Sequence, residues 1–386
     1  MKLVMYGAGS VGRGFIWPLF ASSGWDVVFI DVDLRIIEAL NQRHGYHYTV
    51  VADPSREVCV TGVCGVNGQD EEAVVAEIAD CDLLATALGA SALERVAPII
   101  ARGLERRLGS GTALNILICE NLKDAAARLR DWLAAALPEA LSDASCGLVE
   151  AAIGRMIPVA VPDPNDPLHI AVEEYGFLSI DKEAYIGEVP EVTGLIAVSP
   201  FEFYEQRKLY LHNMGHAICA YLGLLRGYET IAQAVSDPTV RLLTQSAMTE
   251  SAAMLSAKYN VSFARVFDHA EDLLLRFGNV SLGDTCERVG RDPMRKLAAG
   301  DRLAGALSEC WKYEVIPGYI ALGFAAALRH VTADAVEAER LAVQTGGLTQ
   351  EQAALVMRLY PALDGEFTAL PHIVEQIKRE LRGKIV

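Results

Sequence analysis

The chain has 386 residues, of which 52% are hydrophobic and 22% charged, a balance that predicts a folded protein with a substantial core and excludes disorder. Its formal net charge of −16 at pH 7 would repel the phosphates of nucleic acid and anionic lipid headgroups, so neither partner is expected. An anionic small molecule is not excluded, because a local basic pocket can form on an acidic protein.

The first half of the chain alternates strand-like and helix-like segments. Strands are predicted at 3–6, 26–30, 82–87 and 114–119, and helices at 11–22, 33–42, 90–108 and 124–137. Strands that alternate with helices of about 10–15 residues form βαβ units and a parallel, doubly wound sheet. The segment 50–66 interrupts this alternation and is interpreted as an inserted hairpin.

The second half has a different pattern. Residues 147–198 indicate strand extension of the sheet followed by a linker. Beyond residue 201 nearly every segment is helical, with helices predicted at 203–225, 230–258, 263–277, 293–311 and 319–330 and three more before the end. We therefore predict an α/β N-terminal domain of the doubly wound Rossmann type over residues 1–198, and a mainly α-helical substrate and catalytic domain over 199–386.

Targeting and metal signals are missing from the sequence. The N-terminus has no signal-peptide pattern, and no apolar run reaches the roughly 20 residues that cross a bilayer. The eight cysteines form no CxxC pair and the eight histidines show no zinc-site spacing, so reduced thiols and no metal site are expected. A cytoplasmic protein without a membrane partner is predicted.

A glycine-rich turn follows the first strand and spells GxGxxG between a strand and a helix, which is the context that dinucleotide binding requires. Gly7 permits the tight turn, Gly9 lets the backbone approach a pyrophosphate, and Gly12 allows close packing of helix on strand. The alternative is a helix cap with no ligand. The predicted cofactor-binding residues are Gly7, Ala8, Gly9, Ser10, Val11, Gly12 and Asp31.

Asp31 decides which dinucleotide is expected. It ends the second strand 19 residues after Gly12, where a carboxylate can bind the adenosine ribose hydroxyls and would repel a 2′-phosphate. NAD is therefore favoured over NADP. NADP remains the alternative, because Arg35 lies nearby and an arginine at such a place can accommodate the extra phosphate.

Reaction chemistry is indicated in the helical half, between Glu205 and His216. Lys208, Asn213 and His216 are spaced so that they could project from one side of a helix or its entry turn. A lysine can take a hydroxyl proton while an asparagine amide donates to the developing alkoxide or carbonyl oxygen. The alternative is a surface lysine, a capping asparagine and a core histidine.

Two further polar segments are candidates. Asn121 follows the strand at 114–119, at the sheet edge where ligands bind, and is either a second amide donor or the N-cap of the next helix. A basic segment at 288–302 could hold a phosphate or carboxylate, or could be a solvated helix face with salt bridges. Its candidate phosphate ligands are Arg288, Arg291, Arg295 and Lys296.

These motifs together resemble the mannitol dehydrogenase family, the polyol-specific long-chain dehydrogenases. The similarity spans most of the chain and is carried by GAGSVGRGF at 7–15, CEN at 119–121, KLYLHNMGHAICAYLG at 208–223 and RVGRDPMRKLAAGDRL at 288–303. The short chain is more similar to the mannitol-1-phosphate 5-dehydrogenase branch than to the longer mannitol 2-dehydrogenases and hexuronate reductases.

The resemblance implies a role for each candidate. Lys208 would be the general acid/base, Asn121 and Asn213 would form the oxyanion hole, His216 would orient the substrate, and Glu205 would assist proton passage to Lys208. It also implies a zinc-independent enzyme that is a monomer or a weak homo-oligomer.

The implied reaction is NAD-linked hydride transfer between a hexitol phosphate and a ketose phosphate, with mannitol 1-phosphate and fructose 6-phosphate as the default pair. Alternatives are an unphosphorylated polyol dehydrogenase or hexuronate reductase, and, in another class, a non-catalytic NAD sensor. One departure bears on the sugar: family members typically have Val-Asp-Arg where this chain has Ile153-Gly154-Arg155. That aspartate would bind a substrate hydroxyl, and glycine cannot.

Overall fold

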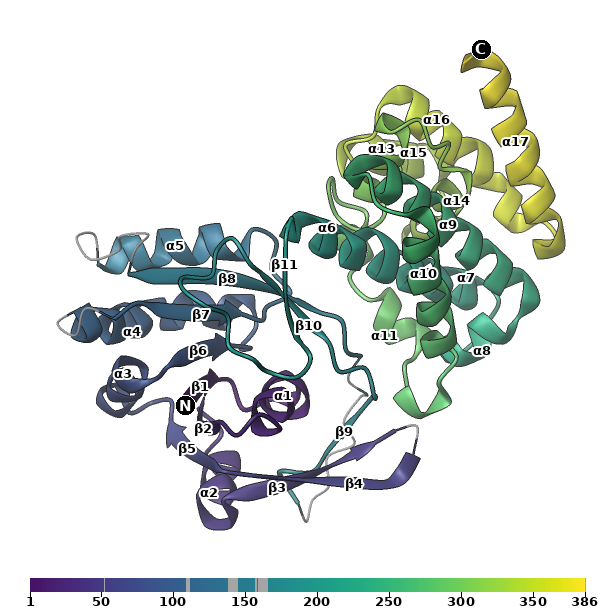
Figure 1. Ribbon diagram of the computed structural model, residues 1–386. Coiled ribbons are helices and arrows are strands. Elements are labelled where there is room, and N and C mark those ends of the chain that lie inside the picture. Colours follow the sequence, from purple (N-terminus) through teal and green to yellow (C-terminus); the bar gives the residue numbers. More distant parts are fainter. Residues whose placement is uncertain (52, 109–111, 138–144, 157, 159–165, 386) are drawn as a thin grey trace. The chain divides into compact units, whose positions relative to one another are not determined.

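A computed structural model describes residues 1–51, 53–108, 112–137, 145–156, 158 and 166–385 (Figure 1). The chain divides into two compact units, Met1–Tyr204 and Glu205–Val386. The first is an α/β unit and the second is helical, in agreement with the predicted fold classes.

An eight-stranded sheet organises the α/β unit, in the order β11-β10-β8-β7-β6-β1-β2-β5. Six neighbouring strands, from β8 to β5, are parallel, whereas β10 runs antiparallel to β8 and β11 is parallel to β10. The strands are β1 (Lys2–Tyr6), β2 (Asp26–Asp31), β5 (Val63–Asn67), β6 (Leu83–Thr86), β7 (Leu114–Ile118), β8 (Cys146–Ile153), β10 (Leu178–Asp181) and β11 (Leu195–Val198).

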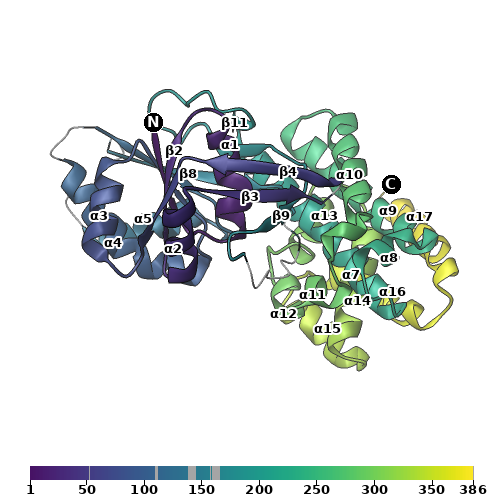
Figure 2. The ribbon, with the colours of Figure 1, turned by 90° about the horizontal axis from the view of Figure 1, so that it is seen from below.

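Helices cover both faces of this sheet because its central strands are apolar on both sides. Every residue of β7 is buried, as expected for a parallel strand between two layers. One apolar cluster packs α3 (Glu71–Asp80), α4 (Ala90–Leu108) and α5 (Ala125–Ala136) on one face, where Figure 2 shows them together. The other cluster includes residues of a π-helical turn (Gly12–Ile16), of α1 (Trp17–Ala21) and of α2 (Leu34–Arg43).

The inserted hairpin exists, but its predicted bounds were wrong. Strands β3 (Gly45–Val50) and β4 (Asp53–Thr61) form the hairpin, and β9 (Ile170–Val172) joins β3 in parallel to complete a small second sheet. Residues 63–66, assigned by the prediction to the hairpin, belong to β5 and pair with β2 at the edge of the main sheet. Both β4 and β5 are short segments that contain valine and cysteine, and their pairing partners distinguish them.

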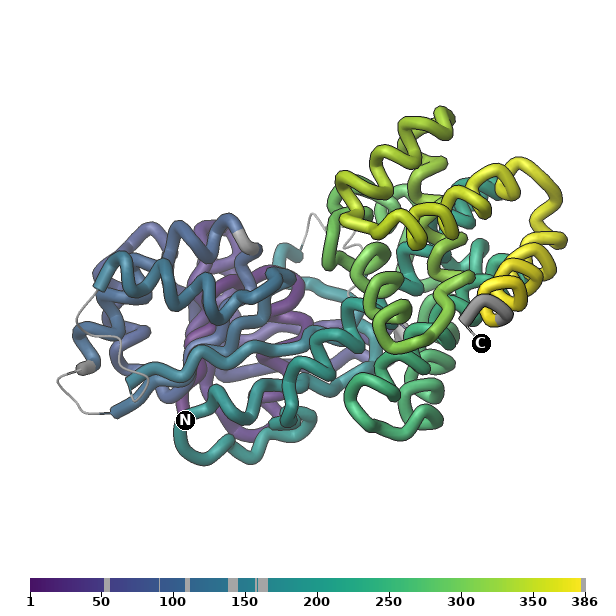
Figure 3. Tube along the Cα trace, turned by 90° about the horizontal axis from the view of Figure 1, so that it is seen from above, coloured from purple at the N-terminus to yellow at the C-terminus, as the bar shows by residue number. Residues whose placement is uncertain are grey.

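The helical unit begins with a long helical segment and continues as packed helices, green to yellow in Figure 3. Its α-helices are α6 (Phe201–Gln206), α7 (Met214–Leu225), α8 (Ile231–Ser236), α9 (Pro238–Tyr259), α10 (Phe263–Phe277), α11 (Cys286–Gly290), α12 (Pro293–Lys296), α13 (Ala304–Lys312), α14 (Gly318–Val331), α15 (Ala335–Gln344), α16 (Gln350–Leu359) and α17 (Leu370–Ile385). The most apolar stretch of the chain, residues 318–328, forms most of α14, and every one of these residues is buried. Among the described residues, no helix has both the length and the apolarity that crossing a bilayer requires.

Two predicted helices are each broken in two. The segment 230–258 divides at Asp237, whose side chain accepts the backbone N–H groups of Thr239 and Val240 and so caps a new helix. The segment 293–311 divides after Lys296, and a turn with Gly300 at φ 74° precedes α13. Asp237-Pro238 and Gly300 are local signals for a helix start and for a turn, and the predicted continuous helices did not take them into account.

Candidate functional site

The glycine-rich turn has the geometry that a pyrophosphate site needs. Gly7 has φ 112°, and a Cβ there would collide with the carbonyl oxygen of Ala87. A Cβ on Gly12 would collide with the carbonyl oxygen of Gly7, so this glycine is needed for close packing of helix on strand. Gly9 has no atom within 4 Å of its Cβ position, which leaves its side open to a ligand. These residues fit a bound dinucleotide.

Asp31 is fixed beside the same turn. Its carboxylate accepts the backbone N–H of Ala8 at 2.8 Å and that of Asp33 at 3.0 Å. Arg35, the residue that could accommodate the 2′-phosphate of NADP, forms an ion pair with Asp33 at 2.7 Å. Because that pair neutralises the arginine, the local charge favours the ribose hydroxyls of NAD over a 2′-phosphate.

Lys208 and Asn213 lie in a π-helical segment, Arg207–Asn213, which continues α6 and leads into α7. In an α-helix of 3.6 residues per turn, positions five apart face different directions. Bonding of the i→i+5 type brings them nearer to one face, and such wide turns often mark functional sites. His216 follows three residues after Asn213 in α7, and Glu205 lies in the last turn of α6. All four side chains are partly buried.

His216 is held as a neutral imidazole. Its ring stacks on Phe277 at 4.7 Å between centroids, and its Nε2 lies 3.5 Å from an Asp284 carboxylate oxygen. Burial, together with the positive charges of Arg288 and Arg302 among others, lowers the pKa of His216 to about 3. A neutral ring can accept or donate a hydrogen bond to a sugar hydroxyl at neutral pH.

The basic segment gathers around the same histidine, although not all of it takes part. Lys296 is only 4% exposed, and burial with the nearby charges of Arg302 and Arg295 lowers its pKa to about 8. Arg288 pairs with Asp284, whereas the side chain of Arg291 is 73% exposed. The structure therefore brings Lys296 and Arg288 toward His216 and leaves Arg291 in solvent.

Two more cations join this cluster: Arg302, which belongs to the predicted basic segment but was not among its candidate ligands, and Arg276, which was not predicted. Arg302 pairs with Asp301 at 2.8 Å and acts on both Lys296 and His216. It returns to the cluster because the chain turns between α12 and α13, where the sequence pattern predicted one straight helix. Arg276 comes from the end of α10, and no local motif indicated it.

Asn121 lies at the carboxyl edge of the main sheet, just after β7, and is exposed. Helix α5 starts at Ala125 with Asp124 as its N-cap, so Asn121 is not the capping residue that the alternative interpretation required. Its place remains compatible with contact to a ligand at this edge.

Gly154, the departure from the family pattern, is packed against an aromatic ring. A Cβ at this position would lie 2.9 Å from Cε1 of Tyr175 and 3.3 Å from its hydroxyl. The next residue, Arg155, donates hydrogen bonds to the backbone carbonyls of Tyr175 and Gly14 and so connects the segments that contain them. An aspartate at 154 would require the Tyr175 ring to move.

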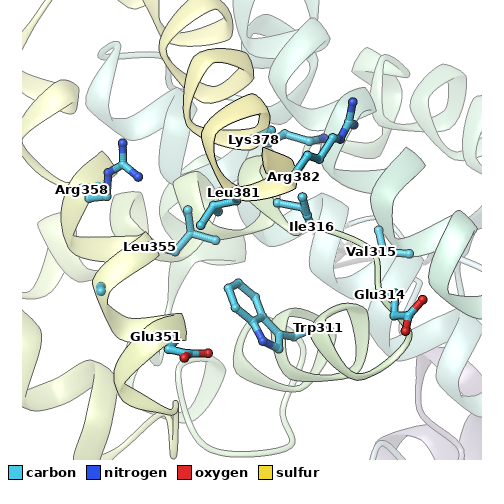
Figure 4. A pocket seen from close by; sticks show the side chains of 11 residues that line it. Trp311, Glu314, Val315, Ile316, Glu351, Leu355, Arg358, Lys378, Leu381 and Arg382 are labelled. Carbon is cyan, nitrogen blue, oxygen red and sulfur yellow. The ribbon is translucent and has the colours of Figure 1, made fainter. Parts of the chain in front are cut away.

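A separate open pocket of about 980 Å³ lies within the helical unit (Figure 4). Trp311 faces it from α13, Leu355 and Arg358 from α16, and Lys378 and Arg382 from α17. None of the residues predicted from the sequence lines it.

Among the residues that the structure describes, no group of three or more His, Cys, Asp or Glu side chains could hold a metal ion.

Comparison with known proteins identifies the family. The model of the mannitol dehydrogenase Rossmann domain matches residues 1–194, and that of the mannitol dehydrogenase C-terminal domain matches residues 200–381. The chain belongs to the mannitol dehydrogenase family.

Solved structures share the fold over nearly the whole chain. A D-sorbitol dehydrogenase in substrate-free form is 14% identical, with a TM-score of 0.74 over 96% of this chain and 94% of that one. A Pseudomonas fluorescens mannitol 2-dehydrogenase, in a ternary complex with NAD and D-mannitol, is 14% identical, with a TM-score of 0.72 over 98% and 94%.

Proposed function

We propose that this chain transfers hydride between NAD and a hexitol phosphate, with mannitol 1-phosphate and fructose 6-phosphate as the default pair. As a member of the mannitol dehydrogenase family, it is an NAD-dependent polyol dehydrogenase. The finer assignment, a phosphorylated substrate, rests on one observation. Lys296 is a buried cation within a cluster of positive charge around His216, and it has no ion-pair partner among the described residues.

Buried cations without a counter-ion are costly, which makes that observation informative. A buried ammonium is ordinarily paired or neutral. The two carboxylates whose charges act on Lys296, Asp292 and Asp301, lie within ion-pair distance of Arg291 and Arg302. Asp284 is paired with Arg288. A phosphate dianion would supply the missing negative charge and accept charge-assisted hydrogen bonds from the cluster. A free polyol would supply neither.

The proposed chemistry is divided among a few side chains. Lys208, as a free amine, takes the proton of the reacting hydroxyl and, in the reverse direction, returns it as an ammonium. The amide of Asn213 donates to the oxygen as it becomes a carbonyl, with Asn121 as a second donor. Neutral His216 binds a neighbouring hydroxyl, and Glu205 relays the proton from Lys208 toward solvent. NAD, when bound, supplies the hydride acceptor.

A substrate comparison tests the assignment. The initial rate of NADH formation is measured with mannitol 1-phosphate and with free mannitol under the same conditions. The proposal predicts a kcat/KM at least about 100-fold higher for the phosphate ester, since two or more charge-assisted contacts distinguish the substrates. Efficient turnover of free polyols or hexuronates, with none of the ester, would refute the phosphate assignment. It would favour the unphosphorylated alternative, since one structural relative was solved with D-mannitol.

A non-catalytic NAD sensor is the second candidate, and Lys208→Ala separates it from an enzyme. Loss of the proton acceptor should reduce turnover by about 100-fold or more while NADH binding is retained. A wild-type chain that binds NADH but turns over none of these substrates in either direction would support the sensor.

A further inference from the structure

The order of strands in the main sheet reverses beside β1, and two loops border that point. Strand β1 pairs with β2 on one side and β6 on the other. The backbone N–H of Ala87, after β6, donates to the carbonyl of Tyr6, at the end of β1, at 2.9 Å. Gly7 lies so close to Ala87 that no side chain fits there. Nucleotides bind at such reversals, so the loop 87–89 borders the proposed NAD site.

Glu120, two residues after the end of the neighbouring strand β7, holds that loop. It is 7% exposed. Its two carboxylate oxygens each accept one backbone N–H, from Leu88 and from Gly89, both at 2.8 Å. Gly89 directly precedes the 19-residue helix α4, so the carboxylate also lies at the positive end of that helix.

We propose that Glu120 is a positioning residue for the cofactor: it fixes the loop 87–89 against the glycine-rich turn before NAD binds. An ionised carboxylate only accepts hydrogen bonds, so it can satisfy two N–H donors at once. Without this double acceptor the loop must be ordered when the cofactor binds, which weakens binding. The inference rests on the proposed NAD site and is independent of which polyol is oxidised.

Glu120→Gln tests the role with little change of shape. The amide keeps one accepting oxygen but turns an NH₂ donor toward a backbone N–H, so one N–H of the loop loses its partner. We expect the Kd for NADH, from fluorescence titration, and the KM for NAD to rise about tenfold. The kcat at saturating NAD should stay within about threefold, because Glu120 does not touch the reacting atoms.

Glu150→Gln is the matched control. Glu120 accepts from the two residues just before α4; Glu150, in β8, accepts a backbone N–H from the first turn of α5, that of Ala126 at 2.7 Å. It also fixes the start of a helix, and it lies on the next strand of the sheet, one strand farther from the reversal. This variant should lower the Tm by a comparable amount and leave the Kd for NADH unchanged.

The outcomes separate positioning from general stability. If both variants lose stability and neither changes the Kd for NADH, Glu120 is only structural and the proposal fails. If Glu120→Gln does not fold, Glu120→Asp decides: it keeps the charge but is one methylene too short, and an unchanged Kd would overturn the role. Failure of the wild-type chain to bind NADH would refute the cofactor assignment as well as this role.

Discussion

Replacing Lys296 by methionine tests how the substrate phosphate is held. The substitution keeps the length and apolar body of the side chain and removes only the ammonium. A hydrogen bond between charged groups contributes about 1.5–3 kcal/mol, which corresponds to a factor of about 10–150 in affinity. We therefore expect the KM for mannitol 1-phosphate to rise by about that factor. Any residual activity with free mannitol should change less than about twofold.

The pH dependence of the same reaction is a second test of the Lys296 ammonium. The pKa of Lys296 is lowered to about 8 in the free protein, so above that pH the ammonium is lost before substrate binds. The kcat/KM for the phosphate ester, divided by that for free mannitol, should fall above about pH 8. This ratio cancels every pH effect that is common to both substrates. In Lys296→Met the ratio should be flat over the same range.

The charge of Lys296 also affects the stability of the folded state. Because the pKa of Lys296 is lowered from 10.5 to about 8, keeping its ammonium charged at pH 7 destabilises the folded state. Since the lowered pKa belongs to the folded state, the cost is complete below about pH 8 and disappears as pH rises toward 10.5. Lys296→Met should therefore unfold at the same or higher urea concentration than wild type at pH 7.

The control for this variant is Lys312→Met, the same change at a side chain that is 65% exposed and pairs loosely with Glu309 at 3.7 Å. It should alter neither KM nor the pH profile. Lys296 does not hold the substrate phosphate if Lys296→Met leaves the ratio of the two kcat/KM values unchanged at pH 7, or if both lysine variants change it equally.

Three further predictions follow from the site geometry. Gly9→Ala should keep the wild-type Tm, because its methyl meets no protein atom, but should bind NADH at least about tenfold more weakly, because that methyl occupies the space proposed for the pyrophosphate. Gly12→Ala should lower the Tm, because its Cβ meets a backbone carbonyl. Thermal melts and NADH titrations that give the reverse pattern would contradict both expectations. Asp31→Ser should lower the NAD-to-NADP ratio of kcat/KM by about tenfold or more, and an unaltered ratio would remove Asp31 from cofactor selection. Gly154→Ala should destabilise the fold by about 1–3 kcal/mol in urea unfolding through contact with Tyr175; a Tyr175→Ala background should relieve that cost, and persistence of the full cost there would show that the clash lies elsewhere.

The sequence by itself determined features that depend on neighbouring residues. Alternation of strands and helices identified the parallel sheet, because burial on both faces imposes continuous apolar strands. The GxGxxG turn and Asp31 were identified because their geometry is local to one strand, one turn and the start of one helix. The predicted folds of both halves were confirmed. The roles of Lys208, Asn213, His216 and Asn121 stay predictions.

Only the tertiary structure decided features that join distant residues. The pattern at 63–67 suits either a hairpin or a sheet edge, and pairing with β2 settles it. The break after Lys296 returns Arg302 to the charge cluster, and Arg276 arrives from another helix. Glu120 and Leu88 are 32 residues apart. Periodicity reports how each segment meets the core, but charge clustering and loop positioning depend on which segments meet each other.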